Sequence, residues 1–144
     1  MRQNTGEAAN LDLKVDWPSD DKLVRHVLAL GNSGGGCLVI GVGERADMTL
    51  DLVGLVAMRD KVDVTKKLHA LVPDALRKDL AIHDFAYDSS DYGALQGKKF
   101  QLVLVLPDSE HMPFVAESGS GEARRGAVYV RRGTESVEAS QSEL

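Results

Sequence analysis

The chain opens with alternating apolar and polar residues, and a helical spacing of apolar residues follows. Over residues 10–15, leucine and valine alternate with polar, mostly charged side chains, which is the period of a half-buried strand. Ser19 is a typical N-cap for the helix that follows, whose first turn carries two aspartates. Apolar residues then recur at helical spacing over residues 23–30, and residues 31–32 are expected to close the helix with left-handed conformations.

The rest of the chain combines a second helical pattern with several strand-like runs. Residues 37–42 form a short apolar run flanked by glycines, which indicates a strand buried on both faces. Residues 60–72 show a helical spacing that stops at Pro73. Further strand-like runs occupy residues 80–87, 100–106 and 127–131. This order predicts an α+β fold, with two main helices packed on one mixed sheet, rather than a repeating parallel α/β fold.

Size and composition are those of one globular domain. The chain has 144 residues, of which 43% are hydrophobic and 27% charged, enough to bury a core within a single domain. We expect an ordered core over about residues 7–135 and a polar, acidic tail over residues 136–144. Ser140 looks like the N-cap of a helix cut off at Leu144, which suggests a domain excised from a longer chain.

The lack of a membrane-spanning or secretory segment and the single cysteine favour a cytoplasmic location. No apolar run approaches the ~20 residues that a membrane span needs, and the polar N-terminus lacks the core of a secretory signal. Cys37 is the single cysteine, so no internal disulfide can form. We therefore predict a cytoplasmic protein with no membrane partner.

The net charge of −5 argues against a basic surface spread over the whole molecule. Basic pairs nevertheless occur at residues 66–67, 77–78, 124–125 and 131–132. One interpretation is that these pairs are solvated surface charges, and the alternative is that some of them line a nucleic-acid-binding face.

Two glycine-rich segments resemble nucleotide-binding loops but lack the neighbours that such loops need. After residues 31–36, Cys37 and Leu38 stand where a P-loop requires lysine and a hydroxyl residue. Residues 41–46 begin Gly-Val-Gly. A dinucleotide fingerprint requires a helix to begin directly after its glycines, and no helical pattern follows these residues. The first segment is interpreted as a tight helix-to-strand turn, with contact between its amides and a phosphate as the alternative. The four histidines are too isolated for a zinc site.

Carboxylates around the first strand form a candidate catalytic site. Asp12 and Lys14 share one face of that strand because strand side chains repeat every two residues. Glu7 precedes the strand, and Glu44 follows the apolar run at residues 37–42. If the two strands are neighbours, these groups converge and suit Mg²⁺ or Mn²⁺, which would activate water against a phosphodiester. The competing interpretation is that they are ordinary exposed acids.

Four segments, in the same order, resemble motifs of the Schlafen-type AlbA_2 family. Residues 11–14 (Leu-Asp-Leu-Lys) resemble its opening Leu-Glu-Phe-Lys strand, and residues 29–36 are similar to its Ala-x-Ala-Asn-Thr-x-Gly-Gly helix end. Residues 38–42 (Leu-Val-Ile-Gly-Val) resemble the next strand, and residues 128–134 resemble a Tyr-x-Arg-x-Gly-Ser strand. The resemblance covers about residues 7–140 and implies a nucleic-acid-handling domain.

The resemblance also implies roles for individual residues. It places Glu7, Asp12 and Lys14 at positions that RNA-cleaving Schlafens use, and Glu44 is the best candidate for a third acid. The chain departs from the family pattern in two places. Asp12 replaces a glutamate and shortens the reach by one methylene, and Glu44 is a single acid where the family has an acidic pair.

Candidate contacts to nucleic acid come from the last strand, the loop before it and the end of the first helix. They are Arg131, Arg132, Arg124, Arg125 and Asn32. Arg131 and Arg132 should point to opposite faces of a strand. Arg131 is the preferred contact, because it matches the arginine of the family motif.

Together these features predict a nucleic-acid-binding domain. Metal-dependent cleavage of structured RNA such as tRNA is a further activity that has to be tested. The alternatives are a non-catalytic DNA-binding or protein-assembly domain of a transcriptional regulator, and a divergent ATP-binding module. Larger Schlafens resemble two such units side by side, so we expect a homodimer, or a part of a larger chain. The dimer would use an apolar patch at residues 112–114 or an exposed edge strand.

Overall fold

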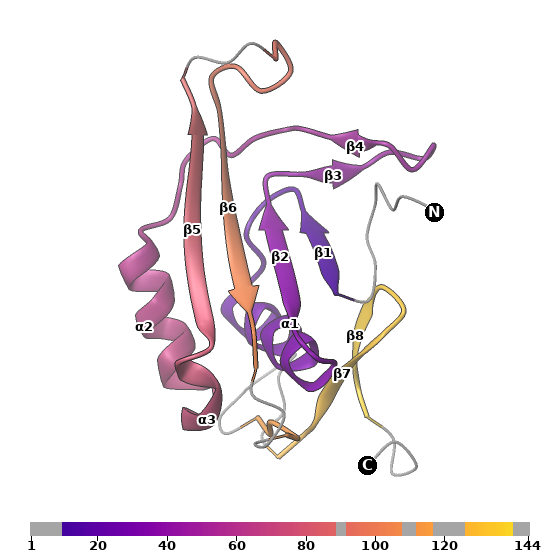
Figure 1. Ribbon diagram of the computed structural model, residues 1–144, viewed down its shortest axis with the longest axis vertical. Helices are drawn as coiled ribbons and strands as arrows, with labels where there is room; N and C mark the ends of the chain where they lie inside the picture. The colour runs from indigo at the N-terminus through magenta and orange to yellow at the C-terminus, as the bar shows by residue number, and fades with distance from the viewer. Residues whose placement is uncertain (1–9, 89–91, 108–111, 117–125, 140–144) are drawn as a thin grey trace.

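The computed structural model describes residues 10–88, 92–107, 112–116 and 126–139 of the chain. It shows a four-stranded sheet with helices on one side and two small hairpins beside it (Figure 1). In chain order the elements are β1 (Leu11–Lys14), α1 (Asp20–Asn32), β2 (Gly36–Ile40), β3 (Gly43–Glu44), β4 (Leu50–Asp51), α2 (Lys61–Leu71), α3 (Asp74–Arg77), β5 (Leu80–Tyr87), β6 (Lys98–Val105), β7 (Tyr129–Arg132) and β8 (Glu135–Glu138). The predicted site residues Glu7, Arg124 and Arg125, and the predicted cap Ser140, lie outside the described residues.

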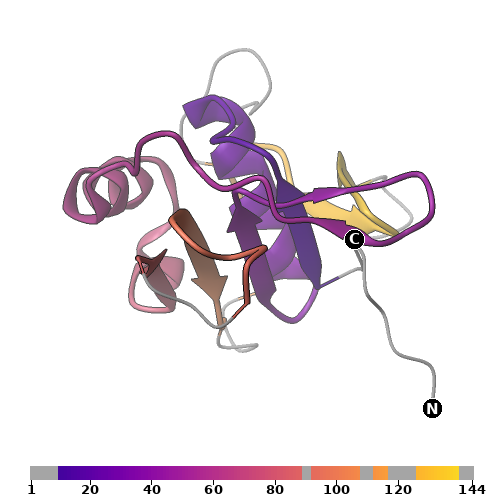
Figure 2. The same cartoon turned by 90° about the horizontal axis from the view of Figure 1, so that it is seen from above.

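The main sheet is mixed, as the sequence predicts. Its strand order is β1-β2-β6-β5, with β1 parallel to β2 and with β6 antiparallel to both β2 and β5. α1 connects the two parallel strands and covers the sheet from one side, and the β3–β4 hairpin extends beyond β1 (Figure 2). The mixed α/β class, with two main helices, is therefore confirmed.

The two main helices begin at the caps that their sequences predict. The Ser19 side chain accepts a hydrogen bond from the backbone of Lys22 at the start of α1, and Asp60 caps α2 in the same way. The apolar stripe of α1 is buried against β2, β6 and α2 in the main core. Among the described residues, no helix combines the length and the apolar character needed to cross a bilayer.

Glycines after α1 allow the chain to turn back into β2. Gly34 and Gly35 have positive φ angles of 93° and 98°. A side chain on Gly36 would collide with the carbonyl oxygen of Asn10, and a Cβ on Gly35 would lie 2.7 Å from the carbonyl oxygen of Val105. The glycine run is thus a tight helix-to-strand turn, but α1 continues through residue 32, so the left-handed residues come later than the sequence predicted.

The two faces of the main sheet differ in burial. Leu38 and Ile40 of β2 face α1 and are fully buried, whereas Cys37 and Val39 on the opposite face are only half-buried. The prediction that β2 is buried on both faces was wrong, because in the described residues helices cover only one side. A small second cluster around Leu13, Val42 and Phe100 packs on the open face instead.

β7 and β8 form a hairpin that packs against α1 rather than joining the main sheet (Figure 1). The sequence assigned residues 136–138 to a polar tail, but they belong to β8, and Ser136 is only 7% exposed. The pattern did not reveal this strand because its four residues, Glu-Ser-Val-Glu, include a single apolar side chain.

Residues 112–116 contribute Phe114 and Ala116 to the core, while Pro113 and Val115 are exposed. Phe114 is 1% exposed, and Met112 packs against the same core. The side chain of Asn32 donates hydrogen bonds to the carbonyl oxygens of Phe114 and Tyr129 at 2.9 and 2.8 Å. Phe114 is therefore not available to the dimer patch predicted at residues 112–114. The homodimer, through this patch or an edge strand, stays a prediction that light scattering would test.

Candidate functional site

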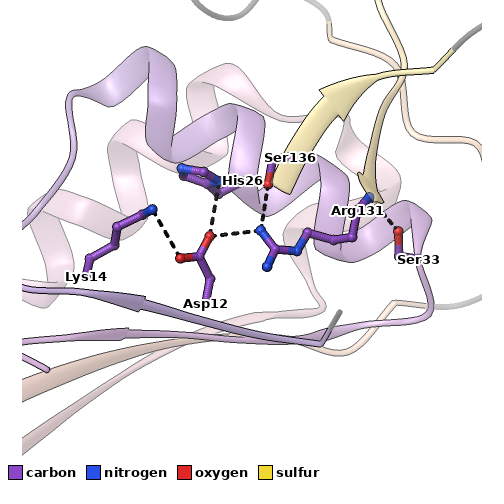
Figure 3. A network of polar contacts seen from close by, with 6 residues as sticks. All are labelled: Asp12, Lys14, His26, Ser33, Arg131 and Ser136. Atoms are coloured by element: carbon purple, nitrogen blue, oxygen red, sulfur yellow. Dashed lines mark hydrogen bonds and ion pairs between the residues drawn. The ribbon is translucent and has the colours of Figure 1, made fainter. Parts of the chain in front are cut away.

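An acid and an arginine from opposite ends of the sequence form the centre of the site. Asp12 lies on the helix-covered face of β1, in register with Leu38, and is 1% exposed. Arg131 reaches it from β7, with a side chain that is 0% exposed. Its Nη1 donates a hydrogen bond to Asp12 Oδ2 at 2.9 Å (Figure 3). Each charge offsets the cost of burying the other, since an unpaired buried charge destabilises a fold by several kcal/mol.

Polar side chains from α1 and β8 complete this arrangement. His26 Nδ1 lies 2.7 Å from Ser136 Oγ and 3.3 Å from Asp12 Oδ2. Arg131 Nη1 also donates to Ser136 Oγ at 3.0 Å. We call the residues drawn in Figure 3 the Asp12 network; they are Asp12, Lys14, His26, Ser33, Arg131 and Ser136. The network links β1, α1 and the β7–β8 hairpin.

Lys14 connects the network to solvent. Its Nζ lies 3.1 Å from Asp12 Oδ1, and its side chain is 32% exposed. The contact is ionic, because no donor within the described residues reaches Oδ1 with hydrogen-bond geometry. Lys14 shares the face of Asp12 because the two residues are two positions apart on β1.

Burial keeps His26 neutral. Desolvation lowers the pKa of His26 from 6.5 to about 4, and the positive charges of Lys14, Arg25 and Arg131 act in the same direction. The negative charge of Asp12 opposes this shift but is the smaller effect. At neutral pH the imidazole therefore carries no charge, and the cations Lys14 and Arg131 outnumber the single carboxylate of Asp12.

A polar pocket lies beside the exposed end of the network. It has a volume of about 250 Å³ and is lined by Lys14, Arg25, His26 and residues 134–137. We call it the Lys14 pocket. Its walls come from β1, α1 and the β7–β8 hairpin, which the Asp12 network holds together.

The structure brings together some of the residues that the sequence singled out. Asp12, Lys14 and Arg131 meet in the network. Glu44 instead lies exposed on β3, where it pairs with Leu50 of β4. Arg132 is exposed on β7, as expected from its position next to Arg131.

Two predicted nucleic-acid contacts have structural partners in the fold. Arg131 was the preferred contact, but its side chain is buried against Asp12. Asn32 binds the backbone of residues 112–116 and of β7. Of these candidates, the exposed one within the described residues is Arg132. A role in binding nucleic acid stays a prediction for all of them.

The described residues do not fit a divalent metal. Asp12 Oδ2 is hydrogen-bonded to Arg131, and Oδ1 faces Lys14, so both carboxylate oxygens contact cations. Within the described residues, no three histidine, cysteine, aspartate or glutamate side chains are grouped to hold a metal ion. The predicted magnesium or manganese site also needs Glu7, which lies outside these residues, and it stays a prediction.

His26 and Ser136 are site residues that the sequence analysis missed. His26 occupies a position on the apolar stripe of α1, three residues after Leu23 and four before Leu30. A titratable side chain on a buried stripe needs a polar partner, and this signal could have identified it. Nothing comparable marks Ser136, because it is a lone serine in a polar segment and its partner on α1, His26, is 110 positions away in the sequence.

Fold and site together define a small mixed α/β domain with a polar pocket beside a buried acid–arginine pair. A family model described as Schlafen, AlbA_2 matches residues 7–140. The chain therefore belongs to this family, which makes it a nucleic-acid-related domain. No curated protein and no solved structure gave a match.

Proposed function

We propose that this domain binds nucleic acid and that the Lys14 pocket contacts the phosphate backbone. The observation that carries the proposal is the position of Lys14, a part-exposed lysine that lines a polar pocket and whose ammonium group contacts a buried carboxylate. A lysine that is already oriented loses less side-chain entropy when it binds an anion than a freely moving one does.

The local charge supports an anionic ligand although the whole chain is acidic. In the network, Asp12 contributes one negative charge, whereas Lys14 and Arg131 contribute two positive charges, which leaves a local excess of +1. Arg25 adds a further positive charge to the wall of the pocket, and Glu135 opposes it from the start of β8. Backbone phosphates are the anions that a nucleic-acid-related domain meets.

The described residues support binding of nucleic acid more directly than they support its cleavage. Neither Asp12 nor Glu44 is placed to share a metal within the described residues, whereas Lys14 already lines a pocket. Metal-dependent cleavage of RNA remains a finer proposal that depends on Glu7. Incubation of a tRNA with the parent chain, with and without Mn²⁺, tests it: cleavage that Glu7→Gln abolishes would support it, and an intact tRNA would count against it.

Fluorescence anisotropy with a labelled RNA hairpin tests the binding proposal. We expect Lys14→Ala to weaken binding to different sequences alike and to lower the slope of log K against log salt by about one, since one phosphate contact is lost. Lys61→Ala is the matched control, because it removes the same charge from an exposed position at the start of α2, outside the basic pairs. Equal affinity of Lys14→Ala and the parent chain, with unfolding curves showing both folded, would reject the Lys14 pocket as the binding site.

A further inference from the structure

The orientation of His26 carries an inference beyond phosphate binding. The side chain is 8% exposed, and its Nδ1 faces Asp12 and Ser136. Figure 3 shows the second ring nitrogen on the opposite side of the ring, toward the Lys14 side of the network. Because His26 also lines the Lys14 pocket, this nitrogen, Nε2, is the ring atom available to a ligand there.

The partners of Nδ1 determine which nitrogen carries the proton. Asp12 Oδ2 is a carboxylate oxygen and can only accept hydrogen bonds. Nδ1 lies 3.3 Å from that oxygen, where a bare nitrogen lone pair would be repelled. We therefore assign the proton of the neutral imidazole to Nδ1. Ser136 Oγ, 2.7 Å from Nδ1, can accept from it while it also accepts from Arg131 Nη1, because a hydroxyl oxygen has two lone pairs. Nε2 is then a hydrogen-bond acceptor.

A neutral acceptor beside a cation selects a particular kind of ligand. The ligand must present a hydrogen-bond donor to His26 and a negative charge to Lys14 within one small pocket. The volume of about 250 Å³ is below the ~300–1,000 Å³ of pockets for drug-sized molecules, so one sugar-phosphate unit is a suitable size. In RNA the ribose 2′-hydroxyl supplies the donor next to a backbone phosphate, and in DNA that hydroxyl is missing.

We propose that His26 Nε2 accepts a hydrogen bond from a ribose 2′-hydroxyl while Lys14 holds the adjoining phosphate, so that the Lys14 pocket selects RNA over DNA. This inference rests on the proposed function, because it assigns the ligand of the same pocket. It makes His26 a specificity-determining residue, with Asp12 and Ser136 fixing the tautomer of its imidazole.

The first test compares three single-stranded oligonucleotides of one sequence: RNA, its 2′-fluoro form and DNA. The 2′-fluoro form keeps the sugar pucker of RNA and adds little bulk, but it has no O–H to donate. Loss of one hydrogen bond should weaken binding of both the 2′-fluoro form and DNA by about three- to ten-fold relative to RNA. Equal affinity for RNA and the 2′-fluoro form would overturn the inference.

The second test uses His26→Asn. The asparagine amide can replace the Nδ1–H donor to Asp12 and Ser136, but it places no acceptor at the position of Nε2. We expect this variant to keep its affinity for DNA and for the 2′-fluoro form and to lose its preference for RNA. A variant that keeps the full preference would assign RNA selection to another residue and reject the inference. If it does not fold, the comparison of oligonucleotides on the parent chain still decides.

The outcomes separate this inference from the proposed function. Loss of binding in Lys14→Ala together with equal affinities for RNA and its 2′-fluoro form would keep the phosphate site and remove the role of His26. Unchanged binding of all three oligonucleotides in Lys14→Ala would instead reject the pocket itself.

Discussion

At the scale of single residues, the site depends on how two buried ionisable groups are paired. Arg131 and Lys14 contact the two oxygens of Asp12, which offsets the cost of burying its carboxylate. His26 keeps a neutral imidazole in the same interior because burial penalises its protonated form. The structure thus combines a charged pair with a neutral histidine, and the neutral histidine makes the stability of the fold depend on pH.

Stability should fall in mild acid because of His26. Its pKa is lowered to about 4 in the folded chain, mainly by burial, with contributions from Lys14, Arg25 and Arg131, against the opposing charge of Asp12. In the unfolded chain the pKa is near 6.5, so the unfolded state takes up a proton first as the pH falls from about 6.5 to 4. The free energy of unfolding should therefore drop by about 2 kcal/mol between pH 7 and pH 5.

Urea unfolding at pH 7, 6 and 5 measures this dependence. His26→Asn is the comparison, since asparagine has no titrating group in this range, while carboxylates elsewhere affect both chains alike. The variant should lose clearly less stability over the same range. An identical dependence in both chains would show that His26 is not the group responsible.

At the scale of elements, the Asp12 network fastens the β7–β8 hairpin to the rest of the fold. The hairpin is not part of the main sheet, and it meets α1 and β1 through Arg131 and Ser136. The backbone N–H of Arg131 also donates to Ser33 Oγ at 2.9 Å, just beyond the end of α1. The Asp12 network therefore helps to hold one wall of the Lys14 pocket, together with the buried Tyr129 of β7 and the hydrogen bond from Asn32 to its carbonyl oxygen.

Removal of the buried carboxylate should release the hairpin. Asp12→Asn leaves the Arg131 guanidinium buried without a counter-charge, which we expect to lower the free energy of unfolding by about 3–5 kcal/mol. Hydrogen exchange should show faster exchange of the β7 and β8 amides, while those of β2 and β6 keep their relative protection.

The double variant Asp12→Leu with Arg131→Met is the matched control for this change. It replaces both charges with apolar groups, so most of the lost stability should return. A single variant as stable as the parent would show that the ion pair is not what holds the hairpin.

At the scale of the whole molecule, the sequence predicted the main sheet and its two helices but only part of the site. Periodicity, caps and glycines were sufficient for α1, α2 and the longer strands, because those signals are local. The short strand β8 was not predictable because it carries a single apolar side chain. The contacts of Arg131 with Asp12 and Ser33 were not predictable because they join residues about a hundred positions apart. Asp12 and Lys14 were found from their spacing, whereas the burial that fixes their chemistry appears only in the fold.

The acidic character of the whole molecule leads to the last prediction. With a net charge of −5, the domain as a whole repels nucleic acid, so binding should depend on where the positive charges lie rather than on their total. Glu135 is exposed at the rim of the Lys14 pocket, and Asp88 is exposed beyond β5, at the opposite edge of the sheet from β1.

Glu135→Lys and Asp88→Lys each change the net charge by two, from −5 to −3 (−5 + 2), but at different places. If the Lys14 pocket is the binding site, Glu135→Lys should bind an RNA hairpin about ten-fold more tightly at physiological salt, with a steeper salt dependence, because it removes a repulsion and adds a phosphate contact. Asp88→Lys should change the affinity by less than about two-fold, since at physiological salt a charge more than ~8 Å away is largely screened. Anisotropy titrations at two salt concentrations compare the variants with the parent, and equal gains from both would mean that net charge, and not the Lys14 pocket, governs binding.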